Sequence, residues 1–357
     1  MTTVCCFGAY DPEYPRNRIV RAGLAAAGFG VLEARVPGRR AWRRWPALAA
    51  AWSRVARRTD VVLVPEFRHK DVPLARVLRG RRPLVFDPLV SRWDTLVEDW
   101  GLHGRASTQA RWNRAIDRWA FGAPDRLLCD TWAHGALFEE LGADRSRLRR
   151  VLVGAEAAFF AVPPPPAPAP HVCLTYIGGF LPLHGVPTLL EAVSRLEARA
   201  ASLPPFVVRL VGQGIELDRT RRIAAERKLT RVEFVGRTPY AEAPRVLAAA
   251  HIVLGAFGTG AKAARVIPHK LWQGLAAGRA VVSGDGEGPR EVFEDGVHLK
   301  LVPRGDADAL AAVLAELVAS PDQRERLGTA GRARARELGT PDAIGRQLAE
   351  ALAGLAP

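Results

Sequence analysis

The sequence lacks the features that mark secreted and membrane-spanning proteins. Its four cysteines (Cys5, Cys6, Cys129 and Cys173) are too few for a disulfide framework and lack the spacing of metal ligands. No run of eighteen apolar residues occurs, so no transmembrane helix is predicted. The first residues, MTTVCCFGAYDPEYP, contain neither the basic region nor the cleavage site of a signal peptide. These absences favour a cytoplasmic protein whose cysteines are buried, reduced thiols.

Acidic residues are scarce relative to basic ones. The chain has 37 Asp and Glu against 51 Lys and Arg, which gives a formal net charge of +14. A basic surface attracts nucleic acid, anionic lipid or phosphorylated small molecules. Since no zinc finger, RNA-recognition motif or similar module occurs, no nucleic-acid partner is expected. No acidic triad suited to a metal ion stands out, and neither a metal nor a cofactor is predicted.

The chain does contain a regular alternation of short apolar runs and helical patterns. This alternation is typical of parallel α/β sheets, and 357 residues suffice for two such domains. In the first half, strands are predicted at 3–7, 31–34, 60–64, 84–87, 126–130 and 149–153. In the second half, strands are predicted at 172–177, 206–211, 232–235 and 251–256, with a further strand after a short helix that opens at Pro268.

A proline-rich stretch separates the two halves. Residues 163–170 read PPPPAPAP, and proline excludes both a helix interior and a central strand. We therefore predict a first Rossmann-like domain over 1–165, a linker over 166–170, a second Rossmann-like domain over 171–340 and a terminal helix within 341–357.

Residues 253–303 contain the most informative pattern. Strands there end in loops that open into helices, and helix N-termini at strand ends bind anions through unpaired N–H groups. Lys262, Arg265, His269 and Lys270 lie on this rim. The pattern predicts a ligand that carries phosphate.

Several motifs in the second half resemble those of one enzyme family. They are KLWQGLAAGRAVV at 270–282, EVFEDG at 291–296, LVPRGD at 301–306, YIGGFLPLHG at 176–185, VGQG at 211–214 and VEFVGR at 232–237. Together they resemble the nucleotide-sugar-binding half of retaining glycosyltransferases of family four, also called group 1, which have the GT-B fold. The resemblance covers most of 171–335 and is loose over 1–160.

The resemblance implies an α/β protein with the GT-B fold, in which two Rossmann-like domains face each other across a cleft. The terminal helix would return to the first domain, which would hold the acceptor. The implied activity is that of a retaining, metal-independent hexosyltransferase of polysaccharide biosynthesis. It would move a sugar from a nucleoside diphosphate donor to a hydroxyl of a glycan or lipid-linked acceptor.

The resemblance also implies how the diphosphate would be held. The backbone N–H groups of Gly178 and Gly179 would approach it, because glycine allows close contact. Lys262 and Lys270 would supply positive charge. His184 stands where the family commonly has lysine, and a neutral imidazole can still donate one hydrogen bond. His184 and Lys270 are therefore catalytic candidates.

The family carries two glutamates eight positions apart, and this chain departs from that pattern. Gln273 stands at the second position, where its amide oxygen can accept a ribose hydroxyl. Arg265 stands at the first and accepts nothing. Either another acceptor such as Asp285 or Glu287 replaces it, or Arg265 binds phosphate or an acidic sugar, or donor chemistry has been lost. Glu291 is predicted to cap a helix N-terminus or to contact the donor.

Acceptor-side candidates follow the strands of the first half. By position they are Gly8, Ala9, Tyr10, His69, Asp87 to Ser91, Asp130, Thr131 and His134. Asp87 is the catalytic candidate among them, since it would orient or deprotonate an acceptor hydroxyl, although it would serve equally as a turn cap. Asp130 and Thr131 are interpreted first as caps, and His134 as a surface residue of a helix.

Residues 39–58 form an arginine-rich segment with Trp42, Trp45 and Trp52 at helical spacing. One interpretation is an interfacial helix that contacts an anionic membrane at the inner face. The other is an ordinary amphipathic helix whose tryptophans pack on the sheet.

Two further functional hypotheses stay open at this stage. The missing glutamate pair and His184 suggest a catalytically silent GT-B scaffold that binds nucleotide or a partner enzyme. An NAD-dependent dehydrogenase is disfavoured, because no GxGxxG motif opens the first helix and Gly8 stands alone there.

Overall fold

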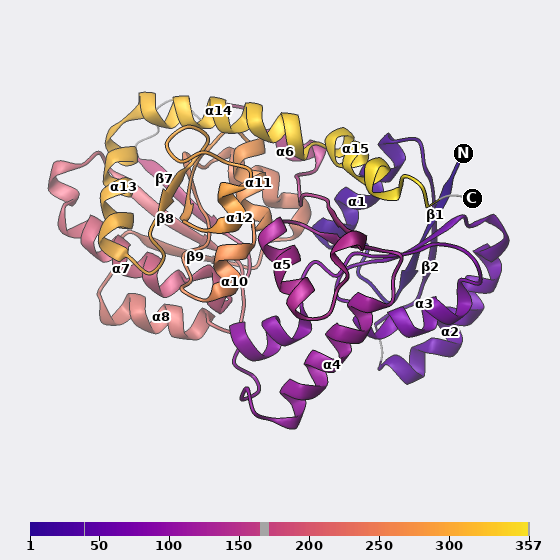
Figure 1. Ribbon diagram of the computed structural model, residues 1–357. Helices are drawn as coiled ribbons and strands as arrows, with labels where there is room; N and C mark the ends of the chain where they lie inside the picture. The colour runs from indigo at the N-terminus through magenta and orange to yellow at the C-terminus, as the bar shows by residue number, and fades with distance from the viewer. Residues whose placement is uncertain (39, 165–170, 356–357) are drawn as a thin grey trace. The chain divides into compact units, whose positions relative to one another are not determined.

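A computed structural model describes residues 1–38, 40–164 and 171–355 (Figure 1). The chain forms two compact units. Unit 1 comprises Met1–Gly154 together with the C-terminal segment from Gly339, and unit 2 comprises Ala155–Leu338. The boundary therefore precedes the predicted one at 165. The predicted linker at 166–170 lies outside the described residues.

Unit 1 contains a six-stranded parallel sheet in the order β2-β1-β3-β4-β5-β6. The strands are β1 Thr3–Gly8, β2 Gly30–Arg35, β3 Val61–Val64, β4 Leu84–Phe86, β5 Arg126–Cys129 and β6 Leu148–Arg150. The helices are α1 Pro15–Ala26, α2 Ala41–Val55, α3 Val72–Leu78, α4 Thr108–Gly122, α5 Trp132–Glu140 and α15 Pro341–Leu352. All four residues of β3 are buried, as expected of a central strand covered on both faces.

The C-terminal helix α15 packs on α1. The terminal helix was predicted to return to the first domain in this way. Two glycines allow this close crossing. A Cβ on Gly345 would lie 2.5 Å from the carbonyl oxygen of Gly23, and a Cβ on Gly23 would lie 3.0 Å from the nitrogen of Gly345. The N–H of Leu152 also donates to Gln347 Oε1 at 2.8 Å. Residues from 339 onward therefore complete unit 1.

Helix α2 packs one apolar face on the sheet. Leu48 and Trp52 are buried, and the Trp52 ring meets Phe7 edge-on with centroids 6.1 Å apart. Trp45 is half-buried against the same core. Trp42 alone among the three tryptophans is exposed. The packing interpretation of 39–58 therefore describes this helix better than the membrane interpretation.

Unit 2 contains a second six-stranded parallel sheet in the order β12-β11-β10-β7-β8-β9. The strands are β7 Val172–Ile177, β8 Phe206–Val211, β9 Val232–Gly236, β10 Ile252–Leu254, β11 Ala280–Gly284 and β12 Lys300–Val302. The helices are α6 Ala157–Phe160, α7 Val186–Ala198, α8 Leu217–Glu226, α9 Ala243–Ala248, α10 Ala261–Arg265, α11 His269–Ala276, α12 Glu287–Arg290, α13 Ala307–Ala319 and α14 Pro321–Gly339.

The structure of residues 253–303 differs in detail from the prediction. The expected Gly/Lys/Arg loop after β10 contains the short helix α10, and β12 follows where no strand was expected. Packing explains the glycines of the turn that follows β11. A Cβ on Gly288 would lie 2.2 Å from the carbonyl oxygen of Arg265. This turn is therefore glycine-rich because α12 lies directly against α10.

Candidate functional site

The candidate site lies in unit 2, at the carboxyl ends of its central strands. Ligands of parallel α/β sheets bind at this edge, where loops lead from strands into helices. The loop after β7 runs from Gly178 to Gly185, and α10 and α11 follow β10. These segments bring together most of the residues that the sequence predicted for the donor.

Glycines let the loops after β7 and β8 touch. The N–H of Gly178 donates to Val211 O at 2.9 Å. A Cβ on Gly212 would lie only 1.9 Å from the oxygen of Gly178, and a Cβ on Gly178 would lie 3.2 Å from Lys270 Nζ. The Gly178 N–H is thus committed to β8, which corrects its predicted role in phosphate binding. Within the described residues, the N–H of Gly179 has no protein acceptor.

Lys270 is buried at the first turn of α11. It is 4% exposed, and its Nζ lies 3.8 Å from the centroid of the Tyr176 ring. Nζ has no hydrogen-bond partner among the residues that the structure describes. Burial holds the pKa of Lys270 well below its usual range. A buried ammonium without a counter-charge is costly, and an anion at this point would relieve that cost.

His184 is buried beside Lys270 and is neutral. Burial lowers its pKa well below the usual range, with Lys270 and Lys262 adding to the effect. Its Nδ1 lies within hydrogen-bond distance of Gly179 O, which only accepts, so Nδ1 carries the proton. The other ring nitrogen, Nε2, is then an acceptor. This tautomer corrects the prediction that His184 donates to a diphosphate; the ring instead braces the β7 loop.

The remaining basic candidates lie on α10. Lys262 is buried in its first turn, close enough to His184 to lower that residue's pKa. Arg265 ends α10 and is half-buried. The structure therefore places Lys262 and Lys270 both within electrostatic reach of His184, and Arg265 at the other end of the short helix.

Gln273 lies one turn further along α11 and is also buried. Its Nε2 donates to the hydroxyl of Tyr240 at 3.0 Å. That bond fixes the orientation of the amide and leaves Oε1 as its acceptor end. Gln273 Oε1 is therefore still able to accept a hydrogen bond from a ribose hydroxyl, and that role stays a prediction. Nothing in the sequence signalled Tyr240 as the partner.

The acidic candidates follow β11. Glu291 lies at the C-terminal end of α12, so the prediction that it caps a helix N-terminus is wrong. Asp285 forms a bidentate pair with Arg290, at 2.6 and 2.8 Å, which lowers the pKa of Asp285. Glu287 is exposed at the start of α12. Of the two proposed substitutes for the family's first glutamate, only Glu287 keeps both carboxylate oxygens available.

The acceptor-side candidates lie at the carboxyl edge of unit 1, where most are buried in structural bonds. Asp87 accepts from Arg16 Nε at 2.8 Å and from Nη2 at 3.2 Å. Arg16 is fully buried and also donates to Leu152 O and Val151 O. Both Asp87 oxygens are thus occupied by a structural ion pair, which corrects its predicted role as a base.

Two more of these candidates have structural partners. Tyr10 is buried and donates to Glu33 Oε1 at 2.6 Å. Ser91 donates to Asp117 Oδ2 at 2.6 Å. The loop that contains Gly8 and Ala9 is held by the N–H of Ala9, which donates to Asp71 Oδ2 at 3.1 Å.

His69 is buried between the rings of Phe86 and Phe121, and its pKa is lowered to about 3 by burial and by Arg92 and Arg68. It is therefore a neutral core residue. Sequence reasoning missed its neighbour in the same loop, Glu66. Glu66 is 1% exposed, and burial next to Asp87 raises its pKa to about 8.

The segment after β5 caps helix α5 and leads to a buried histidine. Thr131 is the N-cap of α5 and accepts from the N–H of His134 at 3.0 Å. His134 Nδ1 lies 2.8 Å from Asp130 Oδ1, and the ring is fully buried. The cap interpretation of Thr131 describes the structure, whereas the surface interpretation of His134 does not.

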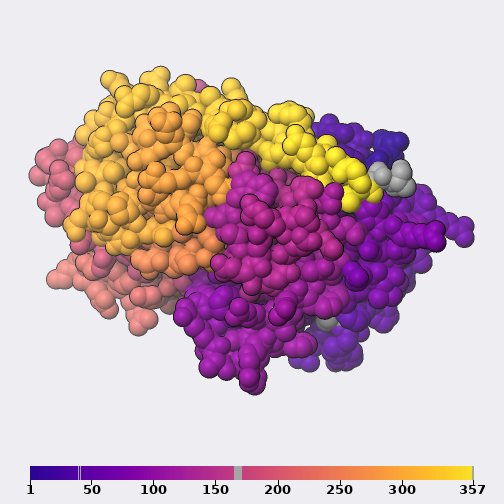
Figure 2. Space-filling view, in the orientation of Figure 1, coloured from indigo at the N-terminus to yellow at the C-terminus, as the bar shows by residue number. Residues whose placement is uncertain are grey.

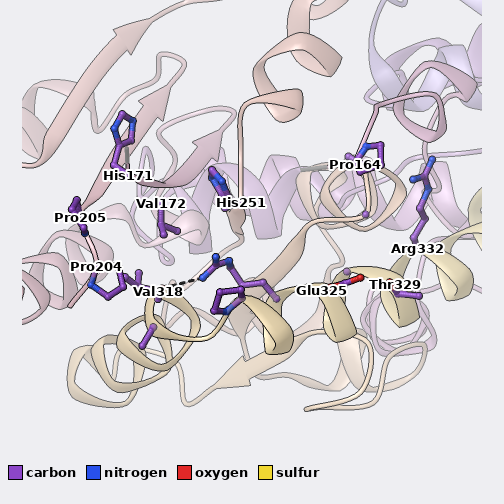
Figure 3. Close-up of a pocket in the computed structure, with 16 residues that line it drawn as sticks. Pro164, His171, Val172, Pro204, Pro205, His251, Val318, Glu325, Thr329 and Arg332 are labelled. Atoms are coloured by element: carbon purple, nitrogen blue, oxygen red, sulfur yellow. Dashed lines mark hydrogen bonds between the residues drawn. The ribbon is translucent and has the colours of Figure 1, made fainter. Parts of the chain in front are cut away.

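A cavity of about 700 Å³ lies at the opposite, amino end of the sheet in unit 2 (Figure 3). Val172, His251 and Arg332 contribute to its walls. Pro164 and His171, which flank the undescribed residues 165–170, also line it. We assign no ligand to this cavity.

Two features are absent from the part of the chain that the structure describes. No group of three or more His, Cys, Asp or Glu side chains there is arranged to hold a metal ion. No described helix has both the length and the apolar character needed to cross a membrane.

Known proteins share the fold and, over part of the chain, the sequence. The structure of HepE from Anabaena, solved in complex with UDP and glucose, superposes with a TM-score of 0.74 at 15% identity, covering 99% of each chain. The lipopolysaccharide core biosynthesis glycosyltransferase LpsE of Rhizobium meliloti is 32% identical over 173 residues, which are 46% of this chain and 44% of LpsE. A phosphatidyl-myo-inositol mannosyltransferase of Mycolicibacterium smegmatis is 32% identical over 157 residues, 43% of this chain and 36% of that protein.

Two six-stranded parallel sheets with this superposition define a GT-B protein. Residues 165–334 match the model of the family described as glycosyl transferases group 1. The second unit therefore belongs to that family, and the resemblance seen in the sequence motifs is confirmed. The chain matches less than half the length of both curated relatives.

Proposed function

We propose that the protein transfers a hexosyl group from a nucleoside diphosphate sugar to a hydroxyl of a glycan or lipid-linked acceptor, with retention and without a metal ion. The observation that carries this proposal is the buried, unpartnered Nζ of Lys270 in the region that matches group 1 glycosyl transferases. UDP and UDP-glucose in structures of HepE support a uridine diphosphate donor. The similarity to LpsE supports an acceptor in polysaccharide biosynthesis.

The site residues would act mainly on the leaving group. When the bond between the anomeric carbon and the phosphate oxygen breaks, negative charge develops on the diphosphate. Lys270 and Lys262 would stabilise that charge, and the N–H of Gly179 would donate to it. His184 positions the β7 loop through Gly179 O and does not itself donate to the phosphate. Gln273 Oε1 would accept a ribose hydroxyl while Tyr240 holds the amide.

One observation favours a second candidate, a silent scaffold that binds nucleotide without transfer. Arg265 occupies the position of the family's first glutamate and cannot accept a sugar hydroxyl. Under the transfer proposal, the exposed Glu287 would take over that role. The two candidates thus differ in what happens to the sugar, and agree on the nucleotide.

A thermal-shift screen followed by a turnover assay separates these candidates. UDP, GDP, ADP, CMP and dTDP and their sugar conjugates are tested with and without magnesium. A ligand at about a hundred times its dissociation constant stabilises by roughly 2.7 kcal/mol, which raises the melting temperature by several degrees. We expect one nucleotide to do so without magnesium, and its sugar conjugate to be consumed when acceptor is present. Binding without consumption would favour the scaffold, and no shift with any nucleotide would contradict both.

A further inference from the structure

Helix α4 of unit 1 exposes two tryptophans to solvent. Trp112 is 63% exposed and Trp119 is 45% exposed. They lie seven residues apart, and this spacing places them on the same face of a helix, two turns from each other. Ala115, which lies between them, is also exposed. The segment around α4, purple in Figure 2, forms part of the surface of unit 1. Large apolar rings in this setting mark an interaction surface.

Three arginines lie on the same helix, and two of them, Arg111 and Arg118, flank the tryptophan face. Arg111, Arg114 and Arg118 are all exposed. None of the three forms an ion pair with any described residue. Arg114 lies against the ring of Trp93, 5.5 Å from its centroid. None of the three charges is neutralised by an acidic side chain of the described residues, and those of Arg111 and Arg118 lie next to the two rings.

The opposite face of α4 contains its acidic residue. Asp117 is fully buried and accepts from the N–H groups of Arg92 and Trp93 and from Ser91 Oγ. Ala110, Ala120 and Phe121 are buried on the same side. The exposed face of α4 thus carries aromatic rings and positive charge without any acidic side chain.

The chemistry of this face fits an anionic membrane better than a protein or nucleic acid. Tryptophan rings with their polar N–H groups settle at the level of lipid headgroups, and adjacent arginines bind the phosphates. The basic composition of the chain, with a net charge of +14, acts in the same direction. We infer that α4, through Trp112, Trp119 and the three arginines, docks unit 1 on an anionic lipid surface. The inference does not rest on the donor site.

Helix α2 provides an internal comparison. It also presents an exposed tryptophan, Trp42 at 65%, together with exposed arginines. Its other two tryptophans, however, pack on the sheet, and the Arg43 guanidinium lies over the Trp42 ring at 4.7 Å. A single ring gives a weaker anchor than a pair two turns apart. The membrane surface therefore lies on α4 rather than at 39–58, where the sequence first suggested it.

Flotation of the full-length protein with lipid vesicles tests the inference. Vesicles of phosphatidylcholine with 30% phosphatidylglycerol serve as the anionic surface, and pure phosphatidylcholine as the neutral one; this composition is about that of a moderately anionic membrane. We expect binding to the first and not to the second, weakened by salt. Trp112→Ala with Trp119→Ala should lower the partition coefficient by about tenfold or more. Arg111→Ala, Arg114→Ala and Arg118→Ala together should lower it roughly a hundredfold.

The matched control is Trp42→Ala with Arg43→Ala and Arg54→Ala, which removes the same residue types from α2. This variant should bind vesicles within about twofold of the parent. Because every substituted residue is exposed, the melting temperatures should agree; if the tryptophan variant unfolds, Ala115→Glu places a charge between the two rings instead. The inference is overturned if the parent does not bind anionic vesicles, if the α4 variants bind as well as the parent, or if the α2 variant loses as much binding. Retention on RNA in place of vesicles would also overturn it.

Discussion

The carboxyl edges of the two sheets treat buried charge in opposite ways. In unit 1, buried arginines face buried carboxylates: Arg16 pairs with Asp87 at 2.8 Å and Arg44 with Asp71 at 2.6 Å. In unit 2, Lys270 is buried with its Nζ 3.8 Å from the centroid of the Tyr176 ring, and Nζ has no hydrogen-bond partner among the described residues. Both sheets are six-stranded and parallel, so the difference does not arise from topology.

The difference separates structural charge from functional charge. A buried pair whose hydrogen bonds are satisfied holds loops in place and has no capacity left for a ligand. An unpaired buried charge lowers the stability of the free protein and is relieved when an anion arrives. By this criterion, Lys270 supports the proposal that unit 2 binds an anion at its carboxyl edge. The same edge of unit 1 is braced around Arg16.

The largest expected effect is on stability, from breaking the pair in unit 1. Arg16→Met would leave Asp87 buried without its partner and would free the carbonyls of Val151 and Leu152. The loss of one partner of a buried pair costs about 3–5 kcal/mol of unfolding free energy. Urea unfolding measures this loss. The double variant Arg16→Met with Asp87→Leu should recover part of it, since no buried charge is then left alone. Equal losses in the single and the double variant would contradict the structural role of the pair.

The corresponding change in unit 2 should have the opposite sign. Lys270→Met keeps the length of the side chain and removes the unpaired charge. The free protein should gain about 1–2 kcal/mol of stability, and stabilisation by the nucleotide found in the screen should be lost. Arg222→Met, on the exposed face of α8, is the control for lost charge and should leave both values unchanged. A destabilised Lys270→Met protein that still binds nucleotide would show that the lysine is structural.

The sequence predicted the fold far better than it predicted which polar residues are free. The strands of both sheets were predictable because buried parallel strands read as short apolar runs, as in Val61–Val64 and Val172–Ile177. The location of Lys270 at the carboxyl edge of the sheet could be predicted because the residue lies in the first turn of a helix that follows a strand. The pairing of Asp87 was not predictable, since Arg16 lies 71 positions away and nothing in a single sequence joins them. The tautomer of His184 depends on Gly179 O, which is a feature of loop geometry. The sequence could not show which helix exposes its tryptophans, because tryptophans at helical spacing occur in both α2 and α4. The structure gives their exposure.

The remaining expected effect depends on pH and concerns Glu66, a buried group of unit 1 whose Oε2 has no hydrogen-bond partner among the described residues. Burial, with Asp87 adding to it, raises its pKa from the ordinary 4.5 to about 8. The folded state therefore holds a proton that the unfolded chain releases at lower pH. Stability from this group is fully present below about pH 4.5 and is lost as pH rises through 8.

Glu66→Gln removes this dependence because the amide does not ionise. The variant and the parent should differ by about 1 kcal/mol or less near pH 5, and the variant should be more stable by roughly 3–5 kcal/mol at pH 9. Unfolding free energies measured at intervals of one pH unit check this. Asp117, whose pKa burial raises to about 6, titrates in both proteins and cancels in the difference. If the difference were instead largest at low pH, Glu66 would be ionised in the folded protein. The carboxyl edge of unit 1 would then hold an unpaired charge of its own, and the contrast with Lys270 would disappear.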